Sequence, residues 1–109
     1  MKNLQVIKEY LQGMDATNGR NLKSYEIKGN GYKIQVLKQY EAILGGYTKT
    51  NYIIEKKEYK GILFINKNYL HYSKTTQTIL NMLDREATQN KYKVVYTSFD
   101  DKLVNKLYM

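Results

Sequence analysis

Lysine and tyrosine are the side chains abundant enough in this sequence to make a chemically distinctive surface. The 109 residues include 12 Tyr and 18 Lys or Arg against 10 Asp or Glu, which gives a formal net charge of +8. Tyrosine rings can stack on bases while lysines meet phosphates, as in single-strand binders, and tyrosine is equally favoured at protein interfaces. The candidate binding residues of this kind are Lys33, Lys56, Lys57, Lys60, Tyr52 and Tyr59.

The same composition also has explanations that need no ligand. Tyrosine is a good strand former, and lysines keep the outer face of a sheet soluble and guard its edges. Lys, Asn, Tyr and Ile have AT-rich codons, so a genome of low GC content would produce the same bias. A positive charge of this size favours polyanionic partners, but it bears on association and not on fold.

A run of hydroxyl side chains in residues 73–76, Ser-Lys-Thr-Thr, opens an apolar helical stripe. Ser and Thr are preferred N-caps because their oxygens accept the unpaired backbone N–H groups of the first turn. The same hydroxyls together with Lys74 would suit a phosphate, because a helix N-terminus attracts anions. The segment therefore predicts a helix cap, with an anion site as the alternative, and Lys74 joins the candidate binding residues.

The side chains that carry most enzymatic chemistry are scarce. The chain has no Cys and one His, which excludes cysteine nucleophiles, thiolate zinc sites and sites built from several histidines. His71 as a general base would need an orienting acid and a nucleophile beside it, and no spacing in the sequence places a carboxylate there. We therefore expect no enzyme activity, no metal and no cofactor.

Length and hydropathy predict a single domain over residues 1–109, because a chain of this size buries one modest core. No apolar run reaches the roughly 20 residues that span a bilayer. Lys8 and Glu9 interrupt the apolar stretch that a secretory signal needs. The lack of cysteine fits a reducing compartment, so we expect a cytoplasmic protein without a membrane partner.

Apolar spacing predicts an N-terminal helix and then a series of strands. Leu4, Ile7, Leu11 and Met14 recur at helical spacing. Beyond Leu22 the period changes to two, which favours short strands joined by short turns. Strands are expected over residues 24–28, 32–40, 51–57, 61–66 and 69–72, with turns at 29–31 and 66–68 and a turn or bulge at Gly45-Gly46.

Helical spacing returns over residues 73–87, a last strand is expected over 93–97, and Asp100-Asp101 would cap a short terminal helix. The predicted fold class is therefore α+β: an N-terminal helix, an antiparallel meander of four or five strands, a helix, a further strand and a short C-terminal helix. The helices are expected to cover one face of the sheet.

Three short segments carry a resemblance: residues 40–43 (Tyr-Glu-Ala-Ile), residues 63–66 (Leu-Phe-Ile-Asn) and residues 72–76 (Tyr-Ser-Lys-Thr-Thr) at the start of a helix. Together, the stretch from Tyr40 to Ala87 resembles a small domain of unknown function that is common in phage and mobile-element proteins. The resemblance covers less than half of the chain. It implies a phage-type origin and no particular reaction.

These observations predict a small non-catalytic accessory protein of phage type that works by binding. It would occupy and sterically block a host protein or nucleoprotein complex, such as a CRISPR effector, in the manner of an anti-CRISPR inhibitor in the host cytoplasm. The alternative is direct nucleic-acid binding through a Lys/Tyr sheet surface. An exposed edge strand or the stripe from Leu103 to Leu107 could also pair two copies as a homodimer.

Overall fold

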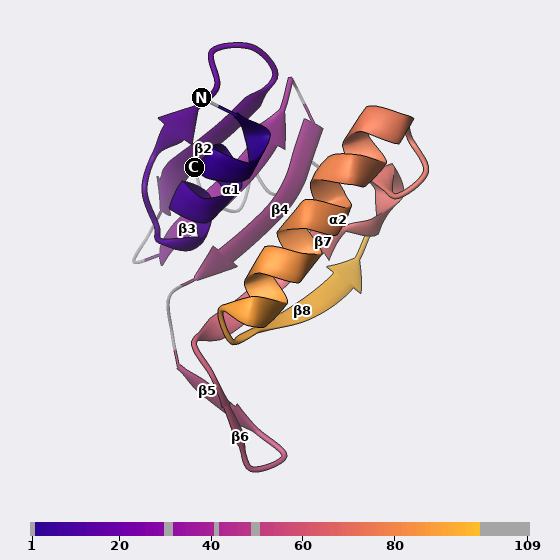
Figure 1. The fold of residues 1–109 in the computed structure, drawn as a ribbon. Coiled ribbons are helices and arrows are strands. Elements are labelled where there is room, and N and C mark those ends of the chain that lie inside the picture. Colours follow the sequence, from indigo (N-terminus) through magenta and orange to yellow (C-terminus); the bar gives the residue numbers. More distant parts are fainter. Residues whose placement is uncertain (1, 30–31, 41, 49–50, 99–109) are drawn as a thin grey trace.

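The computed structural model describes residues 2–29, 32–40, 42–48 and 51–98. In this part of the chain, one sheet is covered on one face by two α-helices, and a small hairpin extends from the sheet (Figure 1). The elements are α1 (Asn3–Leu11), β1 (Ala16–Thr17), β2 (Leu22–Gly29), β3 (Tyr32–Gln39), β4 (Ala42–Thr48), β5 (Tyr52–Ile54), β6 (Lys57–Tyr59), β7 (Gly61–Asn66), the 3₁₀ helix η1 (Lys67–Tyr69), α2 (Lys74–Gln89) and β8 (Tyr92–Thr97).

The main sheet has six strands in the order β1-β2-β3-β4-β7-β8. All neighbouring strands in it are antiparallel except β7 and β8, which are parallel. A parallel pair needs a crossover between its strands, and α2 supplies it. The strands β5 and β6 form a separate two-stranded sheet.

The core lies between the helices and one face of the main sheet. Leu22, Leu37, Leu63 and Ile65 point to this face from three strands, and each is at most 1% exposed. The helices meet them with their own apolar stripes, because residues three and four apart share one side of a helix. The stripe residues are Val6, Ile7, Tyr10 and Leu11 on α1, and Ile79, Leu80, Leu83 and Ala87 on α2.

Gly45 marks the tightest contact of β4 with its neighbour. It pairs with Ile65 of β7 in the antiparallel register. A Cβ placed on Gly45 would lie 2.9 Å from the backbone oxygen of Phe64. The neighbouring Gly46 has more room, because its nearest atom would be Ile34 Cγ2 at 3.4 Å. Close packing of β4 therefore needs glycine at position 45.

Three tyrosines form a buried aromatic cluster at the centre of the core, and each is at most 6% exposed. Tyr47 meets Tyr10 and Tyr92 edge to face, with ring centroids 5.0 Å and 5.2 Å away. The Tyr47 hydroxyl donates to the backbone oxygen of Tyr10, and the Tyr92 hydroxyl donates to that of Leu11 at 2.8 Å. The Tyr10 hydroxyl is buried and has no hydrogen-bond partner.

The structure confirms the α+β class, with two α-helices and a mostly antiparallel sheet in the described residues. The N-terminal helix, the helix after Ser73 and the strand over 93–97 are present, and both α-helices lie on one face of the sheet (Figure 1). The residues described include no helix that is long and apolar enough to cross a membrane. The predicted C-terminal helix lies outside the described residues.

Three predictions about the strands are wrong. The strand over 51–57 is divided by a turn at Glu55 and Lys56 into β5 and β6. The strand over 69–72 is the end of η1 followed by a turn. The last strand pairs parallel to β7, because α2 returns the chain to the same end of the sheet. Gly45 and Gly46 lie within β4, and its register shift against β3 falls between Leu37 and Lys38.

Candidate binding sites

The hairpin formed by β5 and β6 (residues 52–59) gathers most of the predicted binding residues. Tyr52 pairs with Tyr59 across it, and Ile54 pairs with Lys57. Lys56 lies in its turn, and Lys60 follows directly after β6. Figure 1 shows that the hairpin extends away from the main sheet. Five of the seven candidate residues thus belong to one projecting element or its base.

The other two candidates lie at opposite ends of β3. Lys33 is exposed near the end of the sheet from which the hairpin departs, since Gln35 pairs with Tyr47 of β4. Lys74 is exposed on the first turn of α2, close to Gln39 at the far end of β3. Lys33 therefore lies at the end of the sheet from which the hairpin departs, and Lys74 lies at the opposite end, away from the hairpin.

The hairpin has one backbone contact at its base and one side-chain contact along β6. The Lys60 backbone N–H donates to the Lys91 carbonyl at 2.9 Å, which ties the base to the chain before β8. The Lys57 ammonium lies 5.4 Å from the centroid of the Tyr59 ring, within the range of a cation–π contact. The lysine and tyrosine that were singled out in the sequence are therefore close neighbours in space.

The hairpin also carries groups that the lysine and tyrosine pattern does not include. Ile53 is 77% exposed and lies opposite Glu58. Glu55 and Glu58 offset the charges of Lys56 and Lys57, so residues 52–59 carry no net formal charge. The alternation of Ile53 with Tyr52 and Ile54 could have signalled an outward apolar side chain. Ile53 is not among the predicted binding residues, because the sequence pattern predicts that the segment is a strand of the main sheet.

The turn of the hairpin is conformationally strained. Glu55 and Lys56 have φ values of 50° and 66°, the left-handed region that favours glycine. Two-residue hairpin turns with both φ values positive prefer Asn-Gly. Such strain persists where the surrounding structure or a function maintains it.

Replacing this turn with its preferred residues should stabilise the hairpin. We expect the double variant Glu55→Asn with Lys56→Gly to slow amide hydrogen exchange in residues 52–59 about tenfold, because relief of about 1–2 kcal/mol of strain per residue is partly offset by the greater freedom of glycine in the unfolded chain. Exchange measured by NMR, residue by residue, would detect this change. Exchange in β7 serves as the control and should be the same in the variant and the wild type. If exchange in the hairpin is also the same, the turn at Glu55 and Lys56 is not strained.

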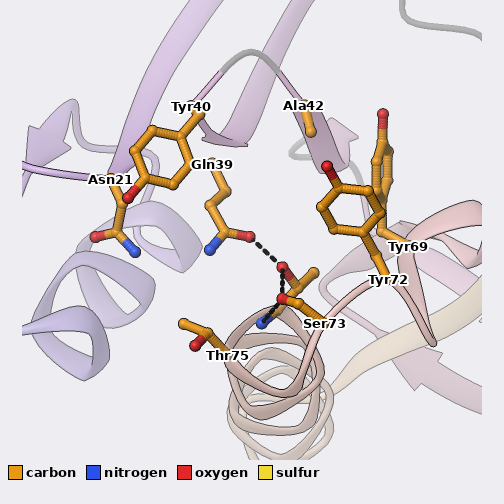
Figure 2. Close-up of a pocket in the computed structure, with 9 residues that line it drawn as sticks. Asn21, Gln39, Tyr40, Ala42, Tyr69, Tyr72, Ser73 and Thr75 are labelled. Atoms are coloured by element: carbon orange, nitrogen blue, oxygen red, sulfur yellow. Dashed lines mark hydrogen bonds between the residues drawn. The ribbon is translucent and has the colours of Figure 1, made fainter.

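A second candidate site is the cavity at the N-terminus of α2, here called the α2 pocket, with a volume of about 540 Å³. Figure 2 shows Tyr40 on one side of it and Tyr72 on the other. Both rings are about three-quarters exposed, at 73% and 72%. Gln39 and Asn21 line the pocket beside Tyr40, and Ser73 lines it from the start of α2. It therefore combines aromatic faces with polar groups.

A hydrogen-bonded chain forms the floor of the α2 pocket. The Ser73 Oγ accepts the Thr76 backbone N–H at 3.1 Å, which confirms the predicted helix cap. The Thr76 hydroxyl donates to Gln39 Oε1 at 2.7 Å, and Thr76 and Gln39 are only 2% and 7% exposed. Sequence reasoning found the cap and missed Gln39, because Gln39 lies on another element far from the motif in sequence.

His71 lies exposed in the turn between η1 and α2, not on a strand beside Tyr69. The described part of the chain contains no group of three or more His, Cys, Asp or Glu side chains that could hold a metal ion.

Of the three segments that carry the phage-type resemblance, residues 72–76 form the end of the turn after η1 and the first turn of α2. Comparisons of the chain with protein-family models, with curated proteins and with solved structures gave no match. The phage-type resemblance stays a prediction.

Proposed function

We propose that the protein acts without catalysis, by binding a macromolecular partner through the β5–β6 hairpin and blocking it sterically. The observation that carries this proposal is Ile53, which exposes 77% of its surface on an element that projects from the fold. An exposed large aliphatic side chain on a projecting element is typical of the apolar centre of a protein interface.

The charge of the hairpin supports a protein partner over a nucleic acid. Glu55 and Glu58 would lie against phosphates if the lysines of the same hairpin met a nucleic-acid backbone. Phosphate binding draws its affinity from uncompensated Lys and Arg. Mixed charges around an apolar centre instead give specificity for a protein surface.

The class of partner is proposed from the phage-type resemblance of Tyr40–Ala87. A phage protein that binds without catalysis gains most by blocking a host machine, so the proposed target is a host nucleic-acid-handling complex such as a CRISPR effector. The protein would then be an anti-CRISPR-like inhibitor that acts in the host cytoplasm.

The test compares capture of partners by the wild type and by two matched variants. Ile53→Ser removes the exposed aliphatic group of the hairpin, and Met14→Ser removes an apolar side chain that is 48% exposed elsewhere. The wild type first captures its partner from nuclease-treated host lysate, and the captured effector complex is then purified. We expect this complex to bind the wild type and Met14→Ser equally. We expect it to bind Ile53→Ser at least about tenfold more weakly, because truncation of a buried interface anchor has an effect of this size. Equal binding by both variants would refute the hairpin as the interface.

The second candidate function is direct nucleic-acid binding, which the position of Lys57 over Tyr59 favours. If about five lysines neutralise phosphates, the logarithm of affinity should fall with the logarithm of salt concentration with a slope of about −4.5. Changing Lys33, Lys56, Lys57 and Lys60 together to Glu should abolish that binding. Gel-shift titrations with single- and double-stranded DNA and RNA at two salt concentrations distinguish this function from the first.

A further inference from the structure

We propose that the α2 pocket is a binding site for a nucleoside phosphate, either a free nucleotide or the phosphorylated end of a nucleic-acid strand. This site is separate from the hairpin and does not depend on the function proposed for it. The volume of about 540 Å³ lies within the range of about 300–1,000 Å³ that is usual for small-molecule sites.

The first observation is that the polar groups of the pocket present donors. Gln39 is more than nine-tenths buried, and its Oε1 is already occupied by the Thr76 hydroxyl. Its Nε2 has no partner among the described residues, and Figure 2 shows it directed toward the space between Asn21 and Thr75. A nearly buried amide that offers unpaired N–H groups to a cavity indicates a ligand with acceptor atoms.

Asn21 repeats the same arrangement beside Gln39. Its Oδ1 accepts a hydrogen bond from Asn18 Nδ2 at 2.7 Å, so its own Nδ2 is the group left for a ligand. The backbone oxygen of Asn21 accepts the Tyr40 N–H at 2.9 Å, which fixes Asn21 beside the Tyr40 ring. Two amides thus use their oxygens within the protein and leave their nitrogens for the cavity.

The second observation is the end of α2 itself. This 16-residue helix begins at the pocket, and the first N–H groups of a helix have no partner within it. They carry partial positive charge and favour phosphate oxygens. Lys74 stands between Ser73 and Thr75, which both line the pocket, and adds a full positive charge nearby. None of the described lining residues is acidic.

The third observation is the pair of exposed rings. Tyr40 and Tyr72 flank the pocket with most of their surface accessible (Figure 2). Tyr72 also meets Tyr69 edge to face, with ring centroids 5.5 Å apart, which limits its rotation. A flat base can stack on such rings, whereas inorganic phosphate cannot. Donors, a helix N-terminus and aromatic faces together point to a base that carries a phosphate.

The test is titration of the full chain with AMP, adenosine and orthophosphate, followed by calorimetry and by NMR shifts of the Gln39 and Asn21 side-chain amides. We expect AMP to bind more tightly than adenosine and orthophosphate do. A 5′-phosphorylated short DNA strand and its 5′-hydroxyl counterpart identify the source of the ligand. Tighter binding of the phosphorylated strand than of AMP assigns the site to strand ends, and the reverse order assigns it to free nucleotides.

The discriminating variants change charge and leave shape nearly constant. Gln39→Glu keeps the acceptor for Thr76 and replaces the donor with a carboxylate, so AMP affinity should fall by about tenfold or more. Gln89→Glu makes the same change at the exposed far end of α2 and should leave AMP affinity within about twofold. Ile53→Ser should also leave AMP binding unchanged.

A cooperative unfolding transition for each variant shows that it folds, and the side-chain amide shifts of the wild type report occupancy independently of any substitution. No heat and no amide shift with millimolar AMP would overturn the proposal. Equal affinity for AMP and orthophosphate, or equal loss in Gln39→Glu and Gln89→Glu, would also overturn it.

Discussion

Gly45→Ala is expected to lower the free energy of unfolding by about 2–3 kcal/mol, as overpacking of a close-packed core does. The added Cβ would lie 2.9 Å from the backbone oxygen of Phe64, and a backbone atom cannot turn aside as the end of a side chain can. β4 and β7 would have to separate, and the hydrogen bonds between the two strands would lengthen. The pairing of Gly45 with Ile65 is the first that should suffer.

Gly46→Ala is the matched control, one residue further along the same strand. Its Cβ would lie 3.4 Å from Ile34 Cγ2, which is ordinary van der Waals contact. Alanine also restricts the unfolded chain more than glycine does, so its stability should change by less than about 1 kcal/mol. Denaturant unfolding of both variants measures the difference. Equal destabilisation would show that the close approach of Phe64 to Gly45 has no special role.

Alkaline pH should unfold the protein steeply, because three phenols are buried together. Burial raises the pKa of Tyr10 well above its ordinary value, and repulsion from charged Tyr47 and Tyr92 raises it further. Burial is also the main cause of the raised pKa of Tyr47 and of Tyr92. In the unfolded chain these phenols ionise near their ordinary pKa of about 10.

The sign of the effect follows from which state binds more protons. Below pH of about 10 both states hold the phenolic protons, so the contribution of the cluster to stability is fully present. Above it the unfolded chain loses protons that the folded protein keeps, and stability falls by up to about 1.4 kcal/mol per pH unit for each phenol. Three phenols give a slope of up to about 4 kcal/mol per pH unit. Denaturant unfolding at a series of pH values measures the slope.

Tyr10→Phe provides the control for this prediction. Its hydroxyl is buried without a hydrogen-bond partner, so its removal should raise stability at neutral pH by about 1–2 kcal/mol. It should also reduce the alkaline slope by about one third, because one of the three ionising groups is gone. An unchanged slope in Tyr10→Phe would assign the alkaline effect to other groups.

Local periodicity in the sequence was enough to predict both α-helices, the cap at Ser73 and the strands β2, β3, β7 and β8, but it did not predict β1 or β4. These features depend on residues a few positions apart. The parallel pairing of β7 with β8 depends on strands that α2 separates, and no local pattern encodes which strands become neighbours. A turn between Glu55 and Glu58 is indicated by the sequence, but its left-handed residues Glu55 and Lys56 are not, because neither is a usual turn former in that region.

The candidate sites show the same contrast between features that are local in the sequence and features that depend on the fold. The predicted lysines and tyrosines of the hairpin came together because they are neighbours in the sequence as well as in space. Lys74 did not join them, because it lies on the first turn of α2 at the end of the sheet opposite the hairpin, whereas Lys33 lies at the end from which the hairpin departs. The α2 pocket brings Asn21 and Gln39 to Ser73 from separate elements. Only the three-dimensional fold reveals that combination.

The crossover from β7 through α2 to β8 has a consequence for the order in which the molecule assembles. The strands β1 to β4 follow one another in the sequence and can pair through contacts that are local along the chain. The seam between β7 and β8 closes only after the intervening helix has been synthesised and has docked. Long-range closures of this kind slow folding, because loop entropy is lost before contacts compensate it. We therefore expect the pairings among β1 to β4 to form first, and the pairing of β7 with β8 to form last.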